Sequence, residues 1–353
     1  MKRFVWLVRN EFKLALTAVP IQLIAIFQPT LMYVLMATIM VTPTFDMRVV
    51  DSSAPEQEDL LTAMAEVGSP IGVRYINPIL VDADEPIESQ VVSIENYGVE
   101  LTAVQHYGYI DSNVVKNYRN RLTASVLNMW NQNLGGRAVT IEQYPWMPEE
   151  IPYITYFGMA LLPTAAFIAA AMIGGYLTAQ EFEFETITEY RLSPLGFGWV
   201  LAARLTRLVL TGLFAASFLM LATGLITGRW PSALWPIYLA LLPVTVVAGC
   251  LGMLAGLLLR STLPTFVIAL GSGFGCWLLG DGFGLAAGFN RTYEAVSRFT
   301  PNAHVVELTF PYYYFGYLVG DPGQSVGMLL LMCVVILTVV TLVYRQRVRA
   351  QQG

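Results

Sequence analysis

The sequence predicts an all-α polytopic membrane protein with about six transmembrane helices and an inserted α+β extracytoplasmic domain. Hydrophobic residues make up 55% of the 353 residues and charged residues only 13%. The mean hydropathy of +0.55 is well above that of a soluble globular domain. The apolar residues are also gathered into long segments, which are interrupted by one long polar segment at residues 42–152.

The N-terminal segment has the pattern of an amphipathic helix. Lys2, Arg9 and Lys13 share one helical face, and Phe4 and Val8 lie on another. This arrangement is typical of a helix that lies flat on an anionic membrane surface. An ordinary basic flank of a transmembrane segment is the alternative. The residues predicted to matter in an interfacial helix are Arg3, Trp6, Arg9, Phe12 and Lys13.

Six apolar segments are long enough to cross a bilayer, whose hydrocarbon core of ~30 Å needs ~20 mainly apolar residues per helix. They cover residues 20–41, 154–178, 200–226, 237–259, 264–279 and 326–344. The fifth segment is short and rich in glycine. Five or seven spans are therefore alternatives to six.

Basic residues near the ends of the spans predict the orientation of the chain. With six spans these residues all fall on one side of the membrane. They are Lys2, Arg3, Arg9, Lys13, Arg204, Arg207, Arg260, Arg345, Arg347 and Arg349. Both termini are then cytoplasmic, and residues 42–152 lie outside. The net charge of -5 argues against nucleic acid as a partner.

The outer segment, residues 42–152, is long enough to fold as a domain of its own. Strands are predicted at 72–81 and 90–94, and a helix at 113–134. The helix has an apolar stripe of Val114, Tyr118, Leu122, Val126 and Trp130. All three cysteines of the chain fall in predicted spans, which leaves the outer segment without a disulfide.

Two features that would supply energy for transport are missing from the sequence. The charged residues near the spans sit at their ends, so the chain has no evident device for coupling to an ion gradient. A phosphate-binding loop needs a lysine followed by Ser or Thr. The three lysines, Lys2, Lys13 and Lys116, are followed by Arg, Leu and Asn.

A charged and aromatic segment separates the second and third spans. It reads Glu-Phe-Glu-Phe-Glu-Thr-Ile-Thr-Glu-Tyr-Arg-Leu-Ser-Pro, from Glu181 to Pro194. Such a segment is too polar for lipid, and its apolar side chains need a partner. We therefore expect it to dock another protein, with a plain solvated charge run as the alternative. Thr178 and Glu181 fit a capping box that would start a new helix here.

This segment resembles the coupling helix of the permease subunits of type-2 ABC transporters, also called type V ABC exporters. In that family the loop typically reads Glu-x-Glu-x-Gly-Thr-Leu-Glu-x-Leu-x-x-Ser-Pro. The matching residues are Glu181, Glu183, Thr186, Ile187, Leu192, Ser193 and Pro194, whereas Glu185 stands where the family has glycine. The resemblance implies an ATPase-coupling role for Glu181, Phe182, Glu183, Glu185, Thr186, Ile187, Glu189, Tyr190, Leu192, Ser193 and Pro194.

Two other parts of the chain are similar to the same family. The N-terminal segment is similar to its interfacial connecting helix. The stretch 297–307, with Pro301, His304 and Glu307, is similar to its outer re-entrant segment.

The resemblance implies a multi-pass permease in the plasma (inner) membrane of a prokaryote, which exports a hydrophobic or amphipathic compound such as a drug, lipid or peptide. Its implied partners are a cytoplasmic ABC ATPase subunit dimer, which binds ATP and Mg, a second permease copy or paralogue, and membrane lipid. Gly271, Gly273 and Gly275 would allow close helix approach where the two permeases meet. This chain itself would hold no cofactor or metal and would not be an enzyme.

The predicted organisation is an interfacial helix at 1–19, a first span at 20–41, an extracytoplasmic α+β domain at 42–152, and the remaining spans at 153–353. The last part includes the coupling helix at 181–194 and the outer re-entrant segment at 281–323. A membrane-anchored sensor or scaffold with an extracytoplasmic binding domain is the alternative function. A hydrolase that uses Ser272 and His304 lacks a G-x-S-x-G elbow.

Overall fold

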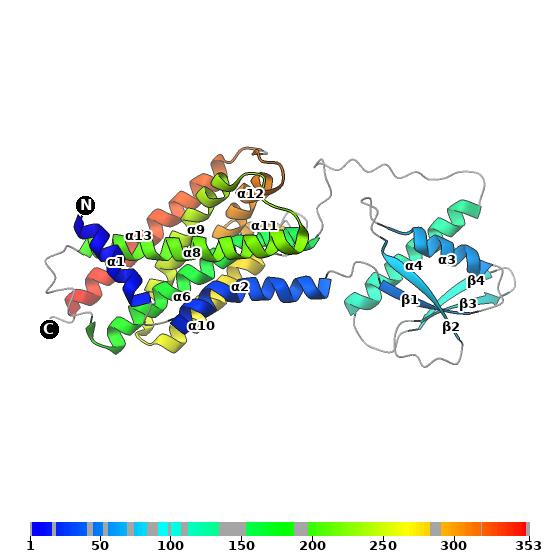
Figure 1. Cartoon of the computed structure of the whole chain (residues 1–353), viewed down its shortest axis with the longest axis horizontal. Coiled ribbons are helices and arrows are strands. Elements are labelled where there is room, and N and C mark those ends of the chain that lie inside the picture. Colours follow the sequence, from blue (N-terminus) through cyan, green and yellow to red (C-terminus); the bar gives the residue numbers. More distant parts are fainter. Residues whose placement is uncertain are drawn as a thin grey trace. The chain divides into compact units, whose positions relative to one another are not determined.

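The computed structural model describes residues 2–15, 19–40, 45–51, 56–68, 74–82, 91–97, 100–106, 112–133, 153–186, 197–282, 291–318 and 320–350. The chain divides into two compact units. One consists of residues 1–37 and 152–353, and the other of residues 38–151. The first is a bundle of helices and the second combines a sheet with helices (Figure 1).

The helical unit contains the apolar part of the sequence. Its helices are α1 (Lys2–Ala15), α2 (Val19–Met40), α5 (Tyr153–Ala160), α6 (Leu162–Glu183), α8 (Phe197–Thr227), α9 (Leu234–Leu259), α10 (Thr262–Leu279), α11 (Arg291–Ser297), α12 (Pro301–Tyr314) and α13 (Gly323–Ala350). In the described part of the chain, six helical stretches are long and apolar enough to cross a membrane. They are Val19–Thr38, Tyr153–Glu183, Gly198–Thr227, Leu234–Leu259, Thr262–Leu279 and Gly323–Arg347. The six predicted spans are confirmed at this level, and the chain is a multi-pass membrane protein.

Helix α6 lies at the centre of this bundle. The apolar window of the α5–α6 stretch is buried over its whole length, and α6 packs against α8, α9 and α10. Glycines bring α6 and α9 close together. A Cβ atom added at Gly252 of α9 would lie 2.0 Å from the carbonyl oxygen of Ala171, and one at Gly174 would lie 2.7 Å from that of Gly249. Neither position accepts a side chain without moving a backbone.

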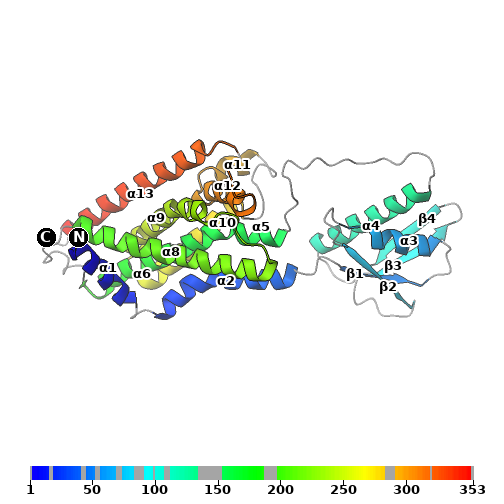
Figure 2. The same cartoon turned by 45° about the horizontal axis from the view of Figure 1, so that its top comes forward.

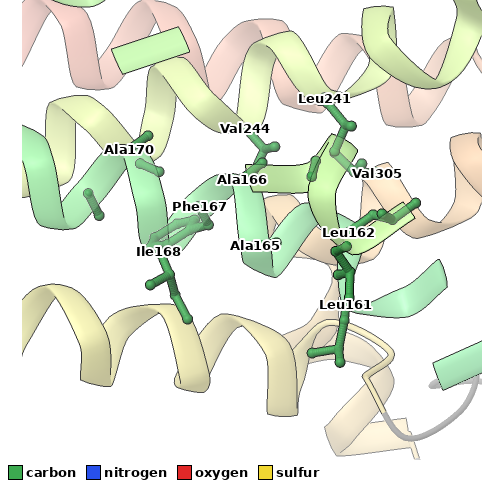
Figure 3. Packing of buried hydrophobic residues seen from close by; sticks show 14 of the residues in the cluster. Leu161, Leu162, Ala165, Ala166, Phe167, Ile168, Ala170, Leu241, Val244 and Val305 are labelled. Carbon is green, nitrogen blue, oxygen red and sulfur yellow. The ribbon is translucent and has the colours of Figure 1, made fainter. Parts of the chain in front are cut away.

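Helix α10 also contacts α6 through a glycine. Ile168 of α6 points toward α10 (Figure 3), and a Cβ added at Gly273 would lie 2.4 Å from its side chain. The expectation that Gly273 serves contact with a second permease is therefore wrong, because this glycine packs within the chain. Gly271 and Gly275 differ from it, since a Cβ at either would have no neighbour within 4 Å.

The second unit has a four-stranded sheet with the strand order β2-β1-β3-β4. Its elements are β1 (Phe45–Val50), α3 (Glu56–Glu66), β2 (Ile76–Val81), β3 (Val91–Tyr97), β4 (Glu100–His106) and α4 (Ser112–Asn133). Strand β1 pairs in parallel with β2 and β3, and β3 pairs antiparallel with β4. Met47 and Val49 of β1, Leu60 and Met64 of α3, and Leu122 of α4 belong to its core.

Sequence patterns located some of these elements and missed others. Strands β2 and β3 and helix α4 occur where they were predicted, while β1, α3 and β4 were not anticipated. Within α4 the predicted stripe is partly wrong, because Trp130 is 58% exposed and Met129 is buried instead. Leu122, Ser125 and Met129 follow the spacing of one helical face, and Trp130 lies beside that face.

Different helices lie at the two ends of the helical unit. The beginning of α1 and the end of α13 lie at one end, which we call the coupling end (Figure 1). Helices α11 and α12 lie at the other (Figure 2). Most of α12 is buried, and its 14 residues span only about 21 Å. It is therefore too short to cross a bilayer and penetrates the bundle from one end.

Candidate functional site

The segment predicted to dock another protein covers residues 181–194, and we call it the docking segment. It begins inside α6, which continues without interruption to Glu183. The capping box predicted for Thr178 and Glu181 is therefore wrong. Thr178 is buried, and its hydroxyl donates to the carbonyl oxygen of Gly174 at 2.9 Å. A threonine whose hydroxyl bonds to the preceding turn of its own helix does not start a new one.

Glu181 is buried within a cluster of charged side chains at the coupling end. It pairs with Arg204 of α8 and accepts a hydrogen bond from the hydroxyl of Tyr344 at 3.2 Å. Arg204 and Arg207 each lie 3.6 Å from the carboxylate of Glu11, which belongs to α1. We call Glu11, Glu181, Arg204, Arg207 and Tyr344 the charge cluster.

The charge cluster balances two carboxylates against two guanidinium groups. All four charged side chains are at most 7% exposed. Charges removed from water in this way depend on one another, because removing one partner leaves an uncompensated buried charge. The cluster therefore ties α1, α6 and α8 together, and Tyr344 adds α13.

Glu183, the last residue of α6, reaches the start of α10. Its carboxylate accepts a hydrogen bond from the backbone N–H of Thr262 at 2.6 Å and another from the hydroxyl of Thr262 at 2.6 Å. Ser261, which precedes the helix, makes no capping bond with its own side chain. Glu183 therefore supplies the N-terminal cap of α10 from a different helix, and a carboxylate is favourable at this positive end of the helix dipole.

The aromatic residues of the docking segment have different surroundings. Phe182 is half-buried, and the guanidinium of Arg260, at the end of α9, lies 5.4 Å from its ring centre. Phe184 is 68% exposed. Of these two rings, Phe184 is therefore the one available to a partner, although sequence reasoning had favoured Phe182.

The backbone turns at Glu185 through a left-handed conformation, with φ of 56°. This conformation favours glycine and costs an ordinary L-residue roughly 1–2 kcal/mol. Thr186 is the last described residue before the segment 187–196. Ile187, Glu189, Tyr190, Leu192, Ser193 and Pro194 therefore lie outside the described residues.

Helix α1 packs on α8 with one face and exposes the other. The rings of Phe4 and Trp199 lie 5.8 Å apart, and Glu11 is buried. The exposed residues include the apolar Trp6 and Phe12 and the basic Arg9 and Lys13. The side chain of Arg3 lies outside the described part.

The residues predicted for the outer re-entrant segment belong to α12, which lies at the other end of the helical unit from the charge cluster. Pro301 is the first residue of α12. In the same helix the side chain of His304 is buried, whereas that of Glu307 is exposed. The ring of His304 bonds to Ser325 of α13 and to the carbonyl of Arg298. The hydroxyl of Ser272 donates instead to the carbonyl of Ala269, so Ser272 and His304 have separate partners.

Compared with protein-family models, curated proteins and solved structures, the chain shows no match.

Sequence reasoning did not anticipate the charge cluster. Arg204 and Arg207 were interpreted as a basic flank of a span, and Glu11 was not singled out. One signal was present, since Arg204 and Arg207 lie three residues apart inside an apolar segment. Charged residues at such positions need partners within the bundle.

Proposed function

We propose that the chain is the permease subunit of an ATP-driven exporter for a hydrophobic or amphipathic compound. A separate cytoplasmic ATPase dimer would bind ATP and Mg and supply the energy, and a second permease copy or paralogue would complete the pathway. The coupling end would face the cytoplasm of a prokaryotic cell, with both termini inside and residues 42–152 outside.

The observation that supports this proposal most is that the first residues of the docking segment are bonded to several other helices. Glu181 is joined to α8 and α13, and Glu183 is joined to α10. A force applied to the segment that follows would therefore reach several spans together. A solvated loop between two spans has no need of such attachments.

The backbone at Glu185 gives separate support. The family pattern places glycine at this position, and the chain adopts there the left-handed conformation that glycine favours. The sequence thus departs from the pattern in its side chain, while its backbone at this position has a conformation that glycine favours.

In the proposed mechanism, closure of the ATPase dimer on ATP displaces the docking segment. Phe184 enters a groove on the ATPase, and the charge cluster transmits the displacement to α8 and to α1 on the membrane surface. The cap from Glu183 moves α10 together with the end of α6. Rearrangement of these spans against a second permease then opens a path for the exported compound.

The proposal is tested by purifying the full chain from its native membrane in mild detergent. We expect an ABC ATPase to co-purify and to hydrolyse ATP in the presence of Mg, whereas the chain freed of partners neither binds nor hydrolyses ATP. Phe184→Ala should strongly reduce co-purification, and Trp130→Ala, a matched truncation of an exposed ring in the other unit, should leave it unchanged. ATPase activity of the clean polypeptide alone would contradict the proposal, as would loss of transport when only the proton gradient is collapsed.

The separate unit of residues 38–151 favours one alternative, a membrane-anchored sensor or scaffold whose outer domain binds a ligand. Such a protein needs no ATPase. Co-purification therefore distinguishes the two functions.

A further inference from the structure

A pocket lies between α9, α12 and α13, three helices that pack on one another. Its volume is about 380 Å³. Each of the two spanning helices turns one face toward it. The lining residues of α9 are spaced along a single helical face between Pro236 and Pro243, and those of α13 along a face between Val326 and Leu330. Leu308 of α12 closes the inner side. We call this space the apolar pocket.

The apolar pocket has a buried floor and an exposed rim. Ala240, Leu308 and Leu329 are buried and form the floor. Leu239 and Leu330 are exposed and form the rim, and both belong to helices that are long and apolar enough to cross a membrane. The pocket is therefore open on the outer surface of the bundle, between two of its spans.

The chemistry of the walls excludes a polar occupant. Among the described residues that line the pocket none is charged, and the hydroxyl of Tyr312 is the one polar side-chain group. A cavity with such walls does not hold ordered water, but it takes up apolar molecules. A hydrocarbon group is therefore the occupant that the walls favour.

The position of the pocket along α9 shows where this hydrocarbon comes from. The start of α9 lies beside the end of α12, because the N–H of Ala233 donates to the carbonyl oxygen of Tyr312 at 3.1 Å. Trp235, the second residue of α9, is exposed, and tryptophan is enriched where a membrane meets water. The pocket begins at the next residue, Pro236, and continues to Pro243.

The length of the pocket matches part of one leaflet. The advance from Pro236 to Pro243 is about two helical turns, or about 10 Å. One leaflet contributes about half of the ~30 Å hydrocarbon core. The pocket therefore runs from the interface through much of one leaflet, in the direction in which the acyl chains of lipids lie.

We propose that the apolar pocket binds one acyl chain of a membrane lipid, taken from the leaflet at the α12 end of the bundle. The headgroup lies at the interface near Trp235, and the chain extends between α9 and α13 to the floor at Leu329. A side chain from a second copy would enter at one level only, whereas the pocket continues along the helices. This inference does not depend on the proposed transport function.

The first experiment uses the full chain in phosphatidylcholine vesicles that contain a small fraction of lipid with a diazirine near the end of one acyl chain. On illumination we expect label on Ala240 and Leu329, because a chain in the pocket reaches these buried residues and surrounding lipid does not. Mass spectrometry of peptides locates the label. Label confined to exposed residues such as Leu242 would overturn the proposal, since the pocket would then be empty or covered by another protein, a second copy included.

A substitution that fills the pocket tests the same site. In Ala240→Phe the ring occupies the floor, so the label on Leu329 should fall by roughly 10-fold, which corresponds to ~1.4 kcal/mol of affinity. Leu242→Phe adds a ring to the exposed side of the same helix and should keep the wild-type label. Equal labelling of Leu329 in Ala240→Phe and wild type would overturn the proposal. The wild-type experiment gives its answer even if Ala240→Phe does not fold.

Competition by unlabelled lipid separates the chain from the headgroup. Phosphatidylcholine and phosphatidylglycerol with the same acyl chains should displace the label on Leu329 equally, because no charged residue lines the pocket. An analogue with much shorter chains should displace it poorly, because it does not reach the floor. Displacement that follows the headgroup and not the chain length would contradict the proposal.

Discussion

The carboxylate of Glu11 lies 3.6 Å from the guanidinium of Arg207, although one residue belongs to the first helix of the chain and the other to α8. Both are buried. Exposed ion pairs contribute little to stability, but an unpaired charge in a buried cluster is strongly destabilising. This pair therefore holds α1 onto the bundle.

Removing both members of this pair should destabilise the protein by less than the sum of the two single removals. Glu11→Gln or Arg207→Gln leaves one charge of the cluster unbalanced and should lower the free energy of unfolding by about 3–5 kcal/mol. The double variant restores neutrality and should lose less than the sum. Chemical unfolding in detergent measures this coupling, with Lys13→Gln on the exposed face of α1 as control. Strictly additive losses would show that the pair is not coupled.

The cap that Glu183 provides should be local to the start of α10. Glu183→Ala removes the acceptor of both bonds from Thr262 and should cost about 1 kcal/mol, visible as faster amide hydrogen exchange in the first turn of that helix. Thr262→Ser keeps both donors and serves as control. Unchanged exchange in Glu183→Ala would mean that another group caps the helix.

Relief of the backbone strain at Glu185 should be measurable as a gain in stability. Glu185→Gly permits the left-handed conformation without strain, while Glu185→Ala removes the same side chain and keeps the strain. The glycine variant should be more stable than the alanine variant by roughly 1 kcal/mol. If alanine is equal or better in thermal unfolding, the turn does not have this conformation.

The two phenylalanines at the end of α6 should behave differently. Phe184→Ala removes an exposed ring and should leave the melting temperature unchanged, while weakening ATPase association by ~2 kcal/mol or more, which is about 30-fold in Kd. Phe182→Ala loses the contact with Arg260 and should lower the melting temperature. Binding of the chain to the immobilised ATPase measures the affinity, and thermal unfolding measures the melting temperature. Equal binding by wild type and Phe184→Ala would exclude this ring as an anchor.

The orientation predicted from the basic residues is tested by labelling single cysteines with an impermeant maleimide. In a background without the three native cysteines, Ser112→Cys should label in intact cells and Lys13→Cys only after permeabilisation. The reverse pattern would invert the topology.

The sequence predicted the spans well and the candidate site only in part. The thickness of the bilayer sets the length of an apolar segment that crosses it, so six helices appear where the long apolar segments lie. The partners of Glu181 could not be deduced, because Arg204 and Tyr344 belong to other helices and meet Glu181 only when the helices pack. The capping pattern at Thr178 was misleading for a related reason. The hydroxyl of Thr178 is buried and bonds to the preceding turn of α6, so the packed helix continues through the local capping motif.

The burial of α6 on all sides has a consequence for how the protein tolerates change. The other spans expose part of their surface, as α13 does with only 11% of its apolar window buried, and should accept many apolar replacements there. Helix α6 has no such free face, and a side chain added at Gly174 meets the backbone of Gly249. A complete substitution map should therefore show α6 as a continuous block of intolerant positions, while the surrounding spans show intolerance along single stripes.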